Sequence, residues 1–347
     1  MGFSAKETSF PTRKLGSNGP YVTAIGWGSM GLASDIYGLK ASDEERLRFL
    51  DQVHEKGGLF WDTSDSYGDA EDLLGAWFKK TGKRSEIFLA TKFGSVKDKN
   101  GVNTPNSSAE YAKQACQRSL ERLGVDYIDL FYLHRASEGV PIEQTMRALV
   151  ELKREGKIKY IGLSEVDDVT LRRACNVHHV DALQIEYSIC TPDIESEKGC
   201  NLLQTARELG VAIIAYSPLC RGLSTGNYTK HDQFSAGDVR NTLPRFSEEN
   251  LPKNLELISK LSEVAQRRSC SLVQLSLAWL LAQGEDIIPI PGTKKIKYLD
   301  DNFEAFKVQL TQQDLEDIRD AMSTTEIVGS RYPEASMNLL LRRTREE

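Results

Sequence analysis

Short apolar runs alternate with longer amphipathic stretches along the whole of this chain. The apolar runs are mostly continuous, which is typical of parallel strands that are covered on both faces. They predict eight strands, over residues 22–27, 59–62, 87–92, 128–134, 158–164, 182–187, 211–216 and 287–290. The amphipathic stretches predict helices over residues 42–56, 70–80, 108–123, 141–155, 167–176, 201–209 and 254–267.

Residues at the expected helix ends agree with this assignment. Ser42 and Asp167 stand where an N-cap is needed, and their short polar side chains suit that position. Gly124, Gly156 and Gly210 stand where helices should stop, as glycines often do.

Eight βα units in succession predict a closed (β/α)₈ barrel in a single domain, with the barrel over about residues 20–322. A doubly wound open sheet is the alternative. It fits less well because the glycine-rich segment Gly26–Gly31 opens no obvious helix. A long connection, Cys220–Lys253, and a tail over 323–347 are expected at the C-terminal face, whereas the last residues, Arg342–Glu347, are expected to be frayed.

Composition narrows the possible functions. A 347-residue chain with net charge −6 has no general attraction for nucleic acid or anionic membranes, and no apolar run approaches the length of a membrane span. Its six cysteines form no C-x-x-C pair, so neither a disulfide framework nor a metal site is expected. The reducing cytoplasm is the simplest compartment for such a chain.

Polar groups close three successive predicted strands. Asp62, Lys92 and His134 end the second, third and fourth strands, and Tyr67 follows Asp62 after a short loop. Because neighbouring parallel strands lie about 4.8 Å apart, we expect these side chains to meet at one rim of the barrel.

This set of residue types suits the reduction of a carbonyl group. Hydride attack leaves charge on the carbonyl oxygen, which then needs a proton donor. Tyr67 could donate that proton if the Lys92 ammonium, held by Asp62, lowers the tyrosine pKa from its usual value of about 10. His134 could hydrogen-bond the same oxygen. Taken singly, each residue also has an ordinary structural explanation, but all four in register argue for chemistry.

The chain resembles the aldo-keto reductases over essentially its whole length. The matching segments are FWDTSDSYG, ATKFG, YLHR, GLSEV, QIEYS, AYSPLCRG and IPIPGTKKIKYLDDN. It is most similar to the short-loop branch that contains pyridoxal reductases, perakine reductase and the potassium-channel β subunits. The resemblance implies a catalytic tetrad of Asp62, Tyr67, Lys92 and His134, with Tyr67 as general acid.

The resemblance also implies NADPH as cofactor. It places Ser164 and Gln184 on the nicotinamide amide and Tyr216 against the ring, whereas Glu165 stands where most relatives outside this branch have Asn. Lys294 and Tyr298 are implied near the 2′-phosphate, with Asp301 and Asn302 on the adenine. The remaining residues of the expected cofactor site are Gly28, Ser29, Met30, Asp62, Ser217, Pro218, Leu219, Cys220, Arg221, Arg240, Pro291, Gly292 and Thr293.

Substrate and partners are less determined. Trp27 and Phe93, with Met30 and Tyr37, could wall an apolar substrate pocket beside Tyr67 and His134, although each could equally be core. Pyridoxal, aromatic aldehydes and quinone-like ketones are all compatible, and a homo-oligomer is possible. Two alternative functions stay open: a redox-sensing interaction module like the channel β subunits, with slow catalysis, and an unrelated barrel isomerase or lyase.

Overall fold

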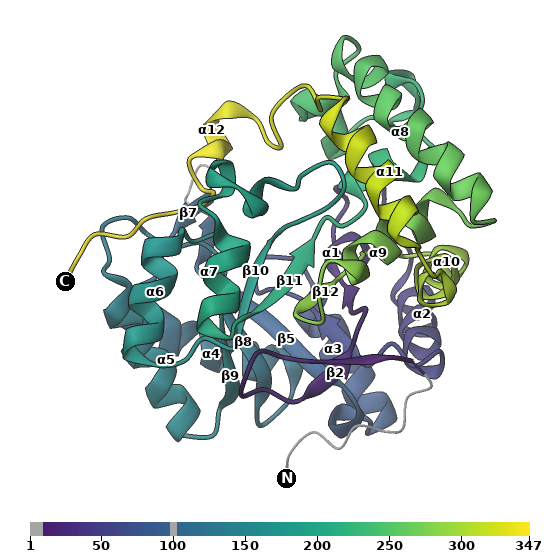
Figure 1. Ribbon diagram of the computed structural model, residues 1–347. Helices are drawn as coiled ribbons and strands as arrows, with labels where there is room; N and C mark the ends of the chain where they lie inside the picture. Colours follow the sequence, from purple (N-terminus) through teal and green to yellow (C-terminus); the bar gives the residue numbers. More distant parts are fainter. Residues whose placement is uncertain (1–9, 98–102) are drawn as a thin grey trace.

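A ring of eight parallel strands forms the centre of the molecule (Figure 1). The computed structural model describes residues 10–97 and 103–347. The strands pair in chain order: β3 (Trp27–Gly28), β4 (Phe60–Asp62), β5 (Phe88–Phe93), β8 (Ile128–Leu133), β9 (Ile158–Ser164), β10 (Ala182–Glu186), β11 (Ala212–Tyr216) and β12 (Ile287–Pro289).

The first and last strands meet and close the ring. Gly28 forms a parallel bridge with Gly292, and the Gly26 amide donates to the Pro289 carbonyl at 2.9 Å. A Cβ added at Gly26 would lie 2.9 Å from both Ile290 and Phe60, so only glycine fits where these strands converge. The predicted (β/α)₈ barrel is therefore confirmed, and the open-sheet alternative is wrong.

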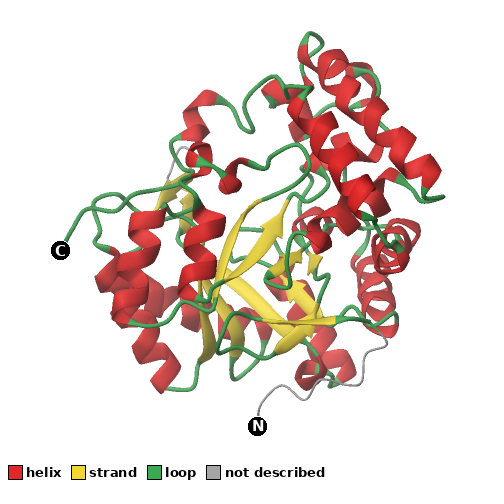
Figure 2. Cartoon of the chain, in the orientation of Figure 1, coloured by secondary structure: helices red, strands yellow, loops and turns green. Residues whose placement is uncertain are grey.

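Helices surround the ring on its outer side (Figure 2). They are α1 (Met30–Ala33), α2 (Asp43–Glu55), α3 (Ala70–Thr81), α4 (Ala109–Leu123), α5 (Ile142–Arg154), α6 (Asp168–Val177), α7 (Leu202–Leu209), α8 (Asn250–Arg267), α9 (Leu272–Ala282), α10 (Ile296–Glu304), α11 (Gln312–Ser323) and α12 (Glu334–Met337). The predicted caps are confirmed: Ser42 accepts from the Glu45 amide and Asp167 from the Thr170 amide, while Gly124 and Gly210 end α4 and α7 in left-handed conformations.

The predicted first strand, 22–27, is wrong in its bounds. Its first two residues, Val22 and Thr23, belong to a hairpin of β1 (Thr12–Lys14) and β2 (Tyr21–Thr23), and the barrel strand begins only at Trp27. Leu15 and Val22 of this hairpin pack against the inward-facing residues of the barrel strands. One continuous apolar run therefore contributes to two elements. Its first residues pack across one end of the barrel, and its last residue begins the first barrel strand.

The region after β11 contains more helix than predicted. The predicted connection 220–253 holds short 3₁₀ turns over Cys220–Thr225, His231–Gln233, Val239–Thr242 and Pro244–Phe246, and α8 begins at Asn250 rather than Asn254. Helix α9 carries no clear amphipathic signal because its residues are almost all apolar and buried. Such a helix cannot be distinguished from a buried strand by periodicity alone.

The C-terminal tail is bound to the barrel rather than frayed. Arg342 pairs with Val166 as a β-bridge, and its amide donates to the Glu165 carbonyl at 2.8 Å. Arg173 then donates to the carbonyls of Thr344 and Arg345, at 2.8 and 2.7 Å. The expectation of a frayed end at Arg342–Glu347 is wrong, because these residues have partners just after β9 and on α5 and α6.

Within residues 10–97 and 103–347, no helix combines the length and the apolar character needed to cross a bilayer.

Candidate active site

The carboxyl ends of β4, β5 and β8 bring together the four residues expected to act as a unit. Lys92 Nζ lies 2.5 Å from Asp62 Oδ1 and donates to Tyr67 Oη at 3.4 Å. The rings of Tyr67 and His134 meet edge to face, with their centroids 5.7 Å apart. The structure thus places all four side chains at one rim of the barrel.

Lys92 is held as a cation by a complete set of acceptors. Besides Asp62 and Tyr67, its Nζ donates to the Thr63 carbonyl at 2.7 Å, so its three protons each have a partner. Burial opposes the charge, but Asp62 and Tyr67 outweigh it and raise the pKa of Lys92. Gln184 donates to the second Asp62 oxygen at 2.8 Å, which leaves both carboxylate oxygens bonded.

The pKa of Tyr67 moves in the direction opposite to the sequence argument. Lys92 does favour the phenolate, but desolvation is the larger effect and raises the pKa of Tyr67 above that of free tyrosine. The phenol therefore keeps its proton at neutral pH. The Lys92 ammonium remains in place to stabilise the phenolate once the proton has been given away.

His134 is a neutral imidazole in this environment. Burial, with the positive charges of Arg135 and Lys92, holds its pKa well below the usual 6.5. A neutral imidazole has one donor and one acceptor nitrogen, so its chemistry depends on which nitrogen carries the proton.

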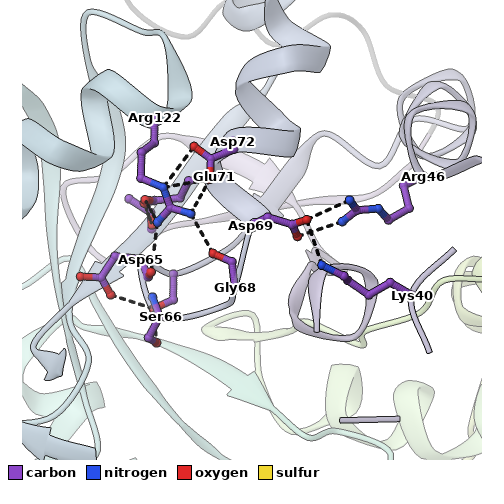
Figure 3. A network of polar contacts seen from close by, with 11 residues as sticks. Lys40, Arg46, Asp65, Ser66, Gly68, Asp69, Glu71, Asp72 and Arg122 are labelled. Atoms are coloured by element: carbon purple, nitrogen blue, oxygen red, sulfur yellow. Dashed lines mark hydrogen bonds and ion pairs between the residues drawn. The ribbon is translucent and has the colours of Figure 1, made fainter. Parts of the chain in front are cut away.

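The loop that carries Tyr67 is fixed from two sides. Gly68 has φ +57°, and a Cβ there would lie 2.7 Å from the Ala33 carbonyl oxygen. From α4, Arg122 donates to the carbonyls of Asp65 and Gly68, at 3.1 and 2.8 Å, while pairing with Glu71 and Asp72 (Figure 3). Tyr67 is therefore positioned by contacts on Asp65 and Gly68, which lie on either side of it in the loop.

The residues expected near a nicotinamide lie at the ends of β9 and β11 and in the middle of β10. Ser164 accepts from Arg135 at 3.2 Å, and Gln184 lies against Asp62 as described above. The Tyr216 hydroxyl donates to Glu165 Oε1 at 2.7 Å. Glu165 itself is fully buried and has φ +50°.

The expected phosphate segment has an unusual backbone. Ser217, Cys220 and Arg221 all have positive φ, at 48°, 52° and 55°, and lie close to Pro218 and Leu219. Arg240 supports this segment, because it donates to the Arg221 carbonyl at 3.4 Å and pairs with Asp238. Aromatic rings also surround its guanidinium, with that of Tyr228 at 4.1 Å.

After β12, the expected adenosine-binding residues lie on and before α10. Lys294 Nζ donates to the carbonyls of Tyr37, Gly38 and Leu39, at 3.2, 3.1 and 3.2 Å. Asp301 accepts from Ser271 and Gln274, both at 2.8 Å, and so holds the start of α9. Asn302 is buried, as are Pro291 and Thr293, whereas Gly292 is exposed.

Two of the expected substrate residues lie elsewhere. Trp27 and Phe93 are fully buried in the layer between strands and helices, where Trp27 packs on Trp61 and Phe93 stacks on Phe131. Both are core residues here, and the expectation that they line a substrate pocket is wrong. Met30 is half-buried beside the rim, after Ser29, so it keeps an accessible surface.

Sequence reasoning missed a buried charged cluster next to Tyr216. Arg331 of the tail lies 3.4 Å from Glu165 and 3.4 Å from Glu186. Tyr332 follows, with its hydroxyl 3.4 Å from that of Tyr216 and its ring under Arg221. The signal was present in Glu165, a charged residue at the end of a buried strand that needs a cationic partner.

Within the described parts of the chain, no group of three or more His, Cys, Asp or Glu side chains is arranged to hold an ion.

Known proteins with similar sequences and structures show the family of this chain. The model of the aldo/keto reductase family matches residues 24–322. Aldo-keto reductase str7 of Strobilurus tenacellus is 50% identical over 325 residues, covering 92% of this chain and 94% of the relative. Aldo-keto reductase yakc [NADP(+)] of Schizosaccharomyces pombe is 47% identical over 328 residues, covering 94% and 95%. Glycerol dehydrogenase AKR11B4 of Gluconobacter oxydans shares the fold, with a TM-score of 0.81 at 23% identity over 92% of this chain and 97% of that one. The chain belongs to the aldo/keto reductase family.

Proposed function

We propose that this protein reduces an aldehyde or a ketone to an alcohol, with NADPH as hydride source and Tyr67 as general acid. One observation carries the proposal: the Lys92 ammonium, held by Asp62 and Thr63, contacts the Tyr67 hydroxyl at the barrel rim beside His134. A proton donor, a cation that stabilises its conjugate base and a neutral hydrogen-bonding imidazole are what protonation of a carbonyl oxygen requires.

The residues present fit a dinucleotide. The Ser29 hydroxyl is buried and has no hydrogen-bond partner among the described residues, which leaves it available to a ligand. The positive-φ residues of Ser217–Arg221 are typical of backbone that presents amides to phosphate. A groove of about 420 Å³ is lined by Tyr298 and Asp301 among others. NADPH bound here would supply the hydride; Ser164, Gln184 and Tyr216 would hold its nicotinamide, and Lys294 its 2′-phosphate.

In this proposal the chain's own residues handle the proton. Tyr67 gives its proton to the carbonyl oxygen as charge develops there, and His134 donates a hydrogen bond to the same oxygen. The phenolate left on Tyr67 is stabilised by Lys92, whose charge Asp62 maintains. The raised pKa of Tyr67 does not prevent this step, because an alkoxide is a far stronger base than a phenolate.

The substrate class that we propose is an aldehyde with a flat ring, such as pyridoxal or an aromatic aldehyde. Met30, Tyr37 and Tyr332 are half-buried near the rim and offer apolar or aromatic surface. A panel of such aldehydes, with aliphatic aldehydes of the same size as controls, tests this choice.

Replacement of Tyr67 by Phe tests the central assignment. We expect NADPH oxidation with an aromatic aldehyde to fall by roughly 10²–10⁴-fold, since general acid catalysis is lost. NADPH binding, followed by its fluorescence, should be unchanged. Full turnover by Tyr67→Phe would contradict the proposal.

A further inference from the structure

A buried hydroxyl lies directly behind His134. Ser64, in the loop after β4, is fully buried, and its Oγ lies 3.2 Å from His134 Nδ1. The same residue supports Tyr67, whose amide donates to the Ser64 carbonyl at 3.2 Å. Ser64 therefore touches both of the residues proposed to act on the carbonyl oxygen.

The hydrogen bonds around Ser64 determine which way its proton points. The Ser66 amide donates to Ser64 Oγ at 3.3 Å, and the Ser66 hydroxyl lies 2.9 Å away. If Ser66 is the donor in both contacts, the two lone pairs of Ser64 Oγ are occupied. The Ser64 proton then has three acceptors in reach: His134 Nδ1 at 3.2 Å, Asp65 Oδ1 at 3.4 Å and the Lys92 carbonyl at 3.5 Å.

We propose that Ser64 is a positioning residue that fixes the tautomer of His134, with Asp65 as the competitor for the Ser64 proton. The inference rests on the proposed function, in which His134 donates to the carbonyl oxygen. When Ser64 donates to Nδ1, the single imidazole proton must lie on Nε2, where it can be donated to substrate. When Ser64 donates to an ionised Asp65, the Ser66 hydroxyl rotates and releases one lone pair of Ser64 Oγ. His134 Nδ1–H then donates to that lone pair, and Nε2 becomes an acceptor.

This competition depends on pH, because Asp65 titrates in the neutral range. Burial and the nearby Glu71 raise the pKa of Asp65 to about 7, although Ser64, Arg118 and Arg122 oppose the shift. Tyr111, from α4, also faces Asp65. Burial, together with the charged neighbours Arg135 and Lys92, holds the pKa of His134 well below its usual value, so the imidazole stays neutral throughout this range.

The protonation state of Asp65 determines which nitrogen of His134 carries the proton. Below neutral pH, Asp65 is protonated, Ser64 donates to Nδ1, and the imidazole proton is on Nε2. Above neutral pH, Asp65 has lost one proton to solvent, and the imidazole proton has moved from Nε2 to Nδ1. The first state suits reduction, because Nε2–H is a donor. The second suits oxidation of an alcohol, because Nε2 can accept from the hydroxyl group.

Nitrogen NMR of the full-length protein tests the tautomer directly. In ¹⁵N-labelled protein at pH 6, His134 should show a protonated Nε2 and a bare Nδ1, and at pH 8 the Nδ1–H form should gain population. Assignment uses the loss of one signal set in His134→Gln. A His134 that carries its proton on Nδ1 at pH 6 would overturn the proposal, and this readout does not depend on turnover.

Matched variants test the role in turnover. Ser64→Ala should populate both tautomers of His134 at pH 6 and lower kcat for reduction by about tenfold. The decrease should not exceed roughly 10²–10³-fold, which is the effect of losing one hydrogen-bond donor to the reacting oxygen altogether. Ser64→Thr, which keeps the hydroxyl, should restore the wild-type tautomer. Asp65→Asn should remove the change of tautomer between pH 6 and pH 8. If Ser64→Ala keeps the pure Nε2–H form and wild-type kcat, the inference is wrong even when Tyr67→Phe behaves as proposed.

Discussion

Arg331 of the C-terminal tail forms a buried ion pair with Glu165 at the end of β9, with Nη1 and Oε1 3.4 Å apart. Glu165 also accepts from the Tyr216 hydroxyl and from the Leu341 amide, so it links the tail to the proposed nicotinamide site. The tail is thus part of the wall of the candidate site.

Replacement of Arg331 by Met should destabilise the protein and release the tail. Removing one partner of a buried pair leaves an uncompensated charge, which typically costs about 3–5 kcal/mol. Denaturant unfolding measures this loss, and limited proteolysis reports on the tail. Glu165→Gln in the same chain should restore much of the stability. The control is Arg48→Met, which breaks the exposed pair with Glu44 and should cost less than about 1 kcal/mol.

Replacement of Gly68 by Ala should displace the loop that carries Tyr67. The added Cβ meets the Ala33 carbonyl at 2.7 Å in a left-handed conformation, so both kcat and stability should fall. Gly82→Ala is the matched control, since Gly82 has φ +67° but open space around it. It should cost only about 1–2 kcal/mol of strain, without an effect on kcat. Equal kcat values for the two variants would contradict the role of Gly68.

Replacement of Lys294 by Glu should shift the cofactor preference from NADPH toward NADH. Loss of a charged hydrogen bond to the 2′-phosphate, worth about 1.5–3 kcal/mol, should lower the ratio of kcat/KM values by roughly 10–100-fold. Lys307→Glu, on an exposed turn, should leave the ratio unchanged. An unaltered preference in Lys294→Glu would remove Lys294 from the cofactor site.

Asp65 should make folding stability depend on pH. Its pKa is about 7 in the fold, against about 3.9 in an unfolded chain, so the folded state binds the proton more tightly. Stability contributed by this group is therefore full below about pH 4 and is lost as pH rises to about 7. Asp65→Asn removes the dependence, so its Tm relative to wild type should rise between pH 5 and pH 8. A constant difference in Tm would contradict the shift.

The sequence was sufficient for the barrel and for the four-residue group at its rim. Strand ends in a parallel barrel share one face, so Asp62, Lys92 and His134 could be placed together from their positions alone. The division into a barrel over about 20–322 and a tail over 323–347 stays a prediction.

Other features depend on contacts between distant parts of the chain. Residues 22–27 form one apolar run, and nothing local shows that it changes role at Trp27. Phe93 and Trp27 follow the apolar pattern of strands, which does not tell the inner face of a barrel from its outer face when both are buried. The attachment of Arg331 to Glu165, 166 residues earlier, could not be found from local pattern. The direction of the Tyr67 pKa shift depends on whether burial, which raises the pKa, outweighs the Lys92 charge, which lowers it. The degree of burial is set by the folded structure and cannot be found from local pattern.

The contact of Gly28 with Gly292 also constrains how the molecule is made. A chain that leaves the ribosome from its N-terminus holds Asp62, Lys92 and His134 long before the residues that close the ring have been synthesised. Folding must therefore wait for a partner more than 260 residues away, while the first strands expose an unpaired edge. During that interval the unpaired backbone groups of this edge are accessible to chaperones and to neighbouring chains.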